Sequence, residues 1–205
     1  MAQCVSQIRV KGNNGVMNDV PCGRCGFCLQ NRRKQWSFRL QKELRYHESA
    51  SFITLTYRDE ELTYADSDFG TYPILVKQDW RLFMKRLRYE QSVLSDRKLK
   101  YYAVGEYGSK TGRPHYHALV FSLDHRVRSR VQEIWSLGNT HVGNVSNDSI
   151  DYITKYVVNK YDHAHYVVPP FASISNGIGL RHLEENFKRY RNETIVRSDR
   201  DWETT

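Results

Sequence analysis

Two apolar runs near the middle of this chain of 205 residues constrain its fold more than any other feature. The runs LKYYAVGEYG (99–108) and HYHALVFS (115–122) are rich in aromatic and β-branched residues, as strands are. The stretch between them, SKTGRP (109–114), contains Gly112 and Pro114, which favour a turn. We therefore predict that the two runs pair as an antiparallel hairpin.

The rest of the chain from residue 51 alternates between strand and helix patterns. Strands are predicted at 51–57 (SFITLTY) and 139–145 (NTHVGNV), amphipathic helices at 76–91, 124–135 and 147–161, and a loop at 58–76. With the hairpin, the order is β-α-β-β-α-β and then one more helix, which is that of a split βαβ or ferredoxin-like arrangement. We predict an α+β fold in which helices cover one face of an antiparallel sheet and the other face is open to ligands.

The segments that flank this core differ from it in composition. We divide the chain into a Cys-rich segment with a basic helix (1–48), the core (49–165) and a C-terminal extension with a tail (166–205). The basic helix is predicted at 29–48, and a short helical stretch is predicted within LRHLEENFKRY.

Two histidines stand one residue apart in the second strand of the predicted hairpin. His115 and His117 point to the same face, because successive side chains on a strand alternate. With the turn centred near Lys110 and Thr111, Glu106 lies opposite His115 on that face. Two imidazoles and one carboxylate suit a divalent metal ion with positions left for substrate oxygen. The alternative is a polar strand face in contact with water.

A pair of tyrosines occupies one face of the predicted helix at 147–161. Tyr152 and Tyr156 are four residues apart, with Lys155 beside them. Tyrosine is a competent nucleophile toward phosphate, and a nearby metal ion would offset the charge on the phosphate oxygens. Lys155 would favour the phenolate or hold a DNA backbone. Because the chain has 14 tyrosines, packing in the core is the competing interpretation.

All the cysteines of the chain lie within its first 28 residues, at Cys4, Cys22, Cys25 and Cys28. Four thiolates would suit a closed structural Zn²⁺ site, although the spacing also serves iron–sulfur clusters, and free thiols in a loop remain an alternative. A metal here would fix the basic helix that carries Arg32, Arg33 and Lys34, whose charges would grip phosphates or simply face solvent.

The charge balance favours a polyanionic partner. Lys and Arg number 31 against 23 Asp and Glu, which gives a formal net charge of +8 and a pI near 9.3. No stretch is long and apolar enough to span a membrane. The first ten residues, MAQCVSQIRV, lack the layout of a signal peptide, so we expect an intracellular protein.

Taken in order, these motifs resemble those of the HUH endonucleases that start rolling-circle replication. SFITLTY resembles their first strand motif, GRPHYHALVF their second and YITKYVVNK their third. The paired tyrosines, with VPCGRCGFCLQNRRKQWSFRL, FMKRLR and GEYG, are similar to the replication initiation proteins of the gokushovirus branch of the Microviridae. The resemblance covers roughly residues 20–185, and only the combination of motifs is specific.

The resemblance implies a function as well as a fold. It implies a palm-like sheet and metal-dependent nicking and rejoining of single-stranded DNA at a viral origin, through a phosphotyrosine, in the cytoplasm of a bacterial host. It makes His115, His117 and Glu106 ligands of Mg²⁺ or Mn²⁺, Tyr152 and Tyr156 nucleophiles, and Lys155 an auxiliary group. Because no Gly-x4-Gly-Lys-Ser/Thr motif is present, unwinding would depend on a host helicase and synthesis on a host polymerase. A non-catalytic zinc-containing regulator that binds nucleic acid is the alternative.

Overall fold

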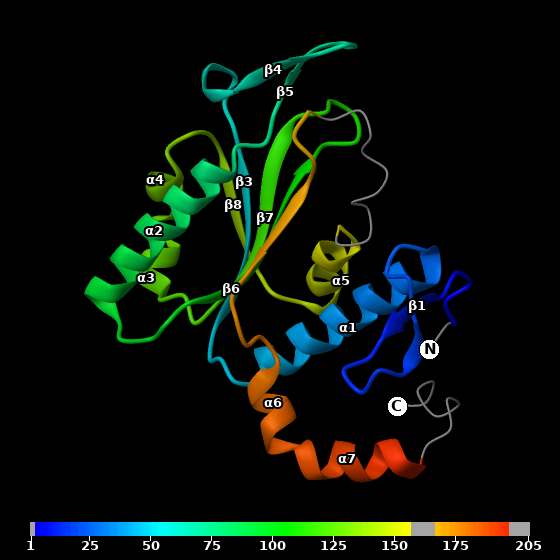
Figure 1. Ribbon diagram of the computed structural model, residues 1–205. Coiled ribbons are helices and arrows are strands. Elements are labelled where there is room, and N and C mark those ends of the chain that lie inside the picture. Colours follow the sequence, from blue (N-terminus) through cyan, green and yellow to red (C-terminus); the bar gives the residue numbers. More distant parts are fainter. Residues whose placement is uncertain (1–2, 157–166, 197–205) are drawn as a thin grey trace.

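The centre of the molecule is a five-stranded sheet. A computed structural model describes residues 3–156 and 167–196 (Figure 1). The strands of the sheet are β3 (Ala50–Thr56), β6 (Lys100–Tyr107), β7 (Pro114–Phe121), β8 (Thr140–Asn144) and β9 (Phe171–Ile174). Their order is β8-β3-β7-β6-β9, and every neighbouring pair is antiparallel. The predicted α+β fold, with the β6–β7 hairpin inside an antiparallel sheet, is therefore confirmed.

Helices pack on both faces of this sheet. On one face lie α2 (Lys77–Leu94), α3 (His125–Arg128) and α4 (Val131–Trp135); on the other lie α1 (Gly26–Leu44) and α5 (Asn147–Lys155) (Figure 1). The larger core includes Trp80, Phe83, Leu87, Tyr116 and Trp135, and the smaller includes Leu40, Tyr102, Leu119, Ile150 and Ile153. The expectation that the second face would be open was wrong for the half under α1 and α5, because the apolar residues of that half require cover.

Several boundaries differ from those that the sequence predicts. The expected loop at 58–76 contains a 3₁₀ turn (Asp59–Glu61) and a hairpin of β4 (Tyr64–Ser67) and β5 (Gly70–Pro73). The helix expected at 124–135 is two short helices, and β9 was not anticipated. The helix expected at 147–161 begins as predicted, but its last part lies outside the described residues.

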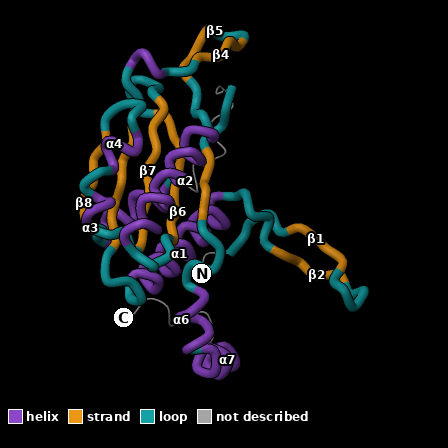
Figure 2. The backbone as a smooth tube through the Cα atoms, turned by 90° about the vertical axis from the view of Figure 1, so that its left-hand side faces the viewer, coloured by secondary structure: helices purple, strands orange, loops and turns teal. Residues whose placement is uncertain are grey.

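The two ends of the described chain carry smaller elements. The N-terminal hairpin consists of β1 (Ile8–Lys11) and β2 (Met17–Val20), and it stands away from the sheet, as does the β4–β5 hairpin (Figure 2). The described chain ends with α6 (Leu180–Glu185) and α7 (Phe187–Val196). In the described ranges, no helix has the length and apolarity needed to traverse a membrane.

A buried carboxylate holds α1 on the sheet. Glu43 of α1 accepts hydrogen bonds from His47 Nε2 (2.9 Å) and Lys100 Nζ (2.7 Å), and its other oxygen accepts from the backbone N–H of Gly179 (2.7 Å). Burial by itself would raise the pKa of Glu43, but these bonds outweigh it and lower the pKa to about 2. The ionised form of Glu43 therefore links α1, β6 and the segment before α6.

We expect Glu43→Gln to lower the free energy of unfolding at pH 7 by about 2–4 kcal/mol, because it leaves the buried partners of the carboxylate unpaired. The folded pKa of Glu43 lies below the ordinary value of 4.5, so its contribution is present above that value and is lost as the pH falls from 4.5 towards 2. Urea unfolding over this pH range should therefore show a smaller pH dependence in the variant. Glu48→Gln is the control, since the Glu48–Arg97 pair is exposed; equal losses in both variants would contradict the assignment.

Candidate active site

Three side chains with metal-binding atoms converge on the uncovered half of the second face. Glu106 of β6 pairs with His115 of β7, and His117 follows on the same face. The register is the one that the sequence predicts. Their ligand atoms all lie within 4.8 Å of one another. Further along the same strands this face becomes apolar and is covered by α5 and α1, so the cluster lies where the cover ends.

Each imidazole is oriented by a hydrogen bond at Nδ1. His115 Nδ1 lies 3.0 Å from the carbonyl oxygen of Arg113, and His117 Nδ1 lies 2.9 Å from Thr54 Oγ1. When Nδ1–H donates to these oxygens, the lone pair of each neutral imidazole is on Nε2. Both Nε2 atoms face Glu106 Oε1, at 2.7 Å for His115 and 2.9 Å for His117. This arrangement is typical of metal-binding histidines.

The cluster is buried and requires positive charge. The side chain of Glu106 is only 5% exposed. Burial would raise the pKa of Glu106, but hydrogen bonds from His115 and His117 outweigh it and lower the pKa. For His115, burial would lower the pKa, but the hydrogen bond with Glu106 and that with the Arg113 carbonyl raise it. In the absence of a metal ion, a proton shared with imidazole therefore balances the carboxylate.

An unpaired atom tests whether a divalent ion fits here. Glu106 Oε2 is buried and has no hydrogen-bond partner among the described residues. A buried carboxylate oxygen without a partner is costly unless a ligand satisfies it. Adjacent ligands of an octahedral Mg²⁺ ion stand about 3 Å apart, close to the separations of Oε1 from the two Nε2 atoms. The set of two imidazoles and one carboxylate thus fits Mg²⁺ or Mn²⁺.

Helix α5 carries the predicted tyrosines to this cluster. Ser146 begins the helix with a capping box: its hydroxyl accepts from the N–H of Ser149 (3.2 Å), and Ser149 Oγ accepts from the N–H of Ser146 (2.8 Å). Ile150 and Ile153 are buried against the sheet. Because the cap and these two anchors set the rotation of the helix, Tyr152 emerges towards His117.

The two tyrosines differ in exposure. Tyr152 is 43% exposed, and its hydroxyl lies 3.4 Å from His117 Nε2. Tyr156 is half-buried at the end of α5, with its ring centroid 5.2 Å from that of Tyr152 and 6.1 Å from that of His117. Burial raises the pKa of Tyr156, and its hydrogen bond with Tyr152 and the charge of Glu106 add to the effect. Tyr152 is therefore the more accessible of the two phenols.

Lys155 and the cysteines complete the predicted site residues. Lys155 is exposed on α5, and no hydrogen bond or ion pair within the described ranges joins it to the cluster. The four cysteines come together near the start of α1 and form a second group of ligand atoms. The structure thus brings together all of the predicted site residues except Lys155, in two separate clusters.

Sequence reasoning missed three contributors to the cluster. Thr54 and the carbonyl of Arg113 orient the imidazoles, and the ring of Phe52 packs on His117 with centroids 5.6 Å apart. Phe52 and Thr54 alternate along SFITLTY, which places both on one face. The available signal was therefore a polar residue on the ligand face of β3, but only the pairing of Thr54 with His117 shows its role.

Comparison with known proteins places this geometry in context. Residues 50–161 match the family of replication-associated protein ORF2. The chain is 34% identical to replication-associated protein ORF4 of Chlamydia phage 1 over 161 residues, which are 69% of this chain and 38% of that protein. It is 30% identical to replication-associated protein ORF2 of Spiroplasma virus 4 over 205 residues, which are 89% of this chain and 63% of that protein.

The chain therefore spans between 38% and 63% of the length of these two relatives. Among solved structures, it is similar to the hypothetical protein ORF119 of Sulfolobus islandicus rod-shaped virus 1. The TM-score is 0.40 at 20% sequence identity, and the match covers 65% of this chain and 98% of that one.

The capping box of α5 gives a test of how the tyrosine helix is held. We expect Ser146→Ala to lower the free energy of unfolding by about 1 kcal/mol, because it removes the acceptor for the N–H of Ser149. Urea unfolding would measure this loss. Ser92→Ala is the matched control, since Ser92 lies on the exposed part of α2 and its hydroxyl donates to the carbonyl of Tyr89. A control variant that lost as much stability would argue against a special role of the cap.

Proposed function

Since the chain belongs to the replication-associated protein ORF2 family, in its gokushovirus-type branch, we propose that it initiates rolling-circle replication of a viral genome. The proposed reaction is the nicking and rejoining of single-stranded DNA at the viral origin through a phosphotyrosine. The family membership concerns replication, while the chemistry rests on the arrangement of the cluster and of α5.

One distance carries the chemical part of the proposal. The hydroxyl of Tyr152 lies 3.4 Å from His117 Nε2, so a phenol that solvent reaches stands beside the proposed metal ligands. A phosphodiester placed between the two would meet a nucleophile and a source of positive charge together. The alternative in which tyrosines at helical spacing simply fill the core does not account for the exposure of Tyr152.

The residues of the cluster would hold and orient a divalent ion. His115, His117 and Glu106 would bind Mg²⁺ or Mn²⁺, while the Arg113 carbonyl and Thr54 keep both Nε2 atoms directed at it. When bound, the ion would supply positive charge to the non-bridging oxygens of the scissile phosphate. Lys155, exposed on the same helix as the tyrosines, would contact the neighbouring DNA backbone.

The proposed step exchanges one phosphodiester for another. The hydroxyl of Tyr152 loses its proton to water, and its oxygen forms a bond to the phosphorus. The bond from phosphorus to the 3′-oxygen breaks, and that oxygen takes up a proton to become a free 3′-hydroxyl. The 5′ end stays on tyrosine as a diester, so the reverse attack by a 3′-hydroxyl rejoins the strand without another energy source.

The structural difference between the tyrosines suggests an order of use. Tyr152 is more exposed, whereas burial of Tyr156 raises its pKa and opposes formation of the phenolate. Tyr152 would therefore attack first, and Tyr156 would take over the strand in the next cycle. Host helicase and host polymerase, acting in the infected bacterial cell, would unwind the DNA and extend the free 3′-hydroxyl.

We expect Tyr152→Phe to reduce the first covalent adduct by at least about 100-fold, because it removes the attacking oxygen. The measurement is the yield of SDS-stable adduct with Mn²⁺ and labelled single-stranded oligonucleotides that tile the genome encoding the chain. Tyr156→Phe should retain this first adduct and lose the transfer of the strand to a second site.

Tyr89→Phe is the matched control, because Tyr89 is an exposed tyrosine of α2 on the opposite face of the sheet. It should form adduct as the unmodified chain does. If the double variant of Tyr152 and Tyr156 kept its adduct yield, the nicking proposal would fail. The alternative function, a non-catalytic zinc-containing regulator, predicts DNA binding without any adduct.

The divalent ion can be tested without DNA. We expect one Mn²⁺ ion per chain, detected by electron paramagnetic resonance, and an affinity at least about tenfold lower in His117→Ala and in Thr54→Val. The first variant removes a ligand and the second removes the oxygen that orients it. His125→Ala should bind as the unmodified chain does, because His125 is exposed on α3. Unchanged affinity in His117→Ala would place the ion elsewhere.

A further inference from the structure

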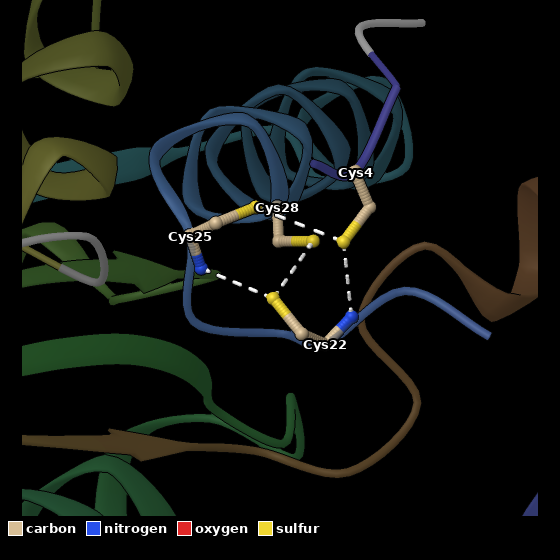
Figure 3. Close-up of side chains that lie close together, drawn as sticks. All are labelled: Cys4, Cys22, Cys25 and Cys28. Carbon is tan, nitrogen blue, oxygen red and sulfur yellow. Dashed lines mark hydrogen bonds between the residues drawn. The ribbon is translucent and has the colours of Figure 1, made fainter. Parts of the chain in front are cut away.

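The four cysteines come from three separate parts of the N-terminal region. Cys4 precedes β1, Cys22 follows β2, and Cys25 and Cys28 lie at the start of α1. Their sulfur atoms nevertheless point into one small space (Figure 3). This cluster is distinct from the candidate active site, which is built from β6, β7 and α5.

We propose that Cys4, Cys22, Cys25 and Cys28 form a closed four-thiolate site for one Zn²⁺ ion, which ties the β1–β2 hairpin to the first turn of α1. The ion would be structural rather than catalytic. This inference is independent of the proposed nicking reaction, because it concerns other residues and another class of metal ion.

The separations of the sulfur atoms fit a tetrahedron around one ion. Zinc–thiolate bonds of about 2.3 Å place adjacent sulfurs about 3.8 Å apart. Cys22 Sγ lies 3.9 Å from Cys28 Sγ, and Cys25 Sγ lies 3.8 Å from Cys4 Sγ. All four ligand atoms are within 4.8 Å of one another. With four protein ligands no position is left for water, as expected of a structural zinc ion.

The same separations argue against disulfides and against an iron–sulfur cluster. Disulfide sulfurs stand about 2 Å apart, and all four cysteines are free. An iron–sulfur cluster distributes its thiolates over several iron atoms with sulfide between them. Sulfurs that all lie within 4.8 Å of one another leave room for one ion only.

Backbone amides around the cluster favour thiolate ligands. The N–H of Cys22 donates to Cys4 Sγ at 3.3 Å, and the N–H of Cys25 donates to Cys22 Sγ at 3.3 Å. Such donors fix the positions of ligand atoms and partly compensate their negative charge. Arg24 lies in the same loop, between two of the ligands.

The N-terminal hairpin needs an anchor that its own side chains do not provide. Its apolar residues are exposed: Ile8, Val10, Val16 and Met17. An isolated two-stranded hairpin is marginally stable, and this one stands apart from the sheet (Figure 2). A metal ion that joins the chain before β1, after β2 and at the start of α1 would close the base of the hairpin.

The anchored helix leads towards the tyrosines. From α1, Arg33 donates to the carbonyl of Asp151 (3.2 Å) and Ser37 donates to its carboxylate (2.8 Å). Asp151 is the neighbour of Tyr152 on α5. A zinc ion at the first turn of α1 would therefore stabilise the helix on which the tyrosine helix packs.

The direct test is the metal content of the full chain, expressed without a histidine tag. We expect about one zinc per chain by mass spectrometry after treatment with EDTA that removes Mn²⁺. X-ray absorption should show four sulfur neighbours at about 2.3 Å. A chain with no zinc and four thiols that react at once with a thiol reagent would overturn the proposal, and so would iron with inorganic sulfide.

Variants test the ligand set. Cys4→Ser removes a ligand that lies outside α1, so the sheet and its cores should still fold; we expect zinc loss to a chelator at least about tenfold faster, with faster proteolysis of residues 3–21. Ser6→Ala, an exposed change nearby, and His117→Ala, at the other cluster, should retain zinc at the unmodified rate. Full retention in both Cys4→Ser and Cys22→Ser would overturn the four-cysteine site. Adduct formation is not part of this readout, so failure of either proposal can be told from failure of the other.

Discussion

The candidate active site depends on the register of the β6–β7 hairpin. A slip of one residue would turn Glu106 to the opposite face from His115 and His117. Behind the two histidines, Tyr116 is buried in the larger core and its hydroxyl binds Tyr57 (2.7 Å) and the carbonyl of Val76 (2.8 Å). Because Tyr116 cannot leave this position without breaking those bonds, the core on one face fixes the ligands on the other.

The second face of the sheet combines packing and chemistry along the same strands. Tyr102 and Leu119 lie under α1 and α5, whereas Glu106 and His117, further along β6 and β7, lie beyond the cover. The tyrosines sit at this boundary because α5 packs by Ile150 and Ile153 and projects Tyr152 past the edge of the core. Partial cover therefore excludes water from one side of the cluster and leaves the other side accessible to a DNA strand.

The sequence predicted the parts of this arrangement that depend on local periodicity. Alternation along a strand places His115 and His117 on one face, and the short turn between the strands sets Glu106 opposite His115. It did not predict β9, whose pairing with β6 joins residues about 70 positions apart, nor the second layer of helices. The position of Thr54 beside His117 likewise depends on pairing between distant strands, which periodicity alone does not encode.

The two ligand clusters differ in what holds them when no ion is bound. Glu106 and its imidazoles lie on paired strands over a buried core and can balance their charge with a proton. The cysteines, by contrast, connect a hairpin whose apolar side chains are exposed, so little besides an ion would hold them together. With ions bound as proposed, the chain would acquire its zinc while it folds and keep it for the lifetime of the molecule. The other ion could come and go with each round of work, so a newly made chain would depend on cellular zinc once and on magnesium or manganese repeatedly.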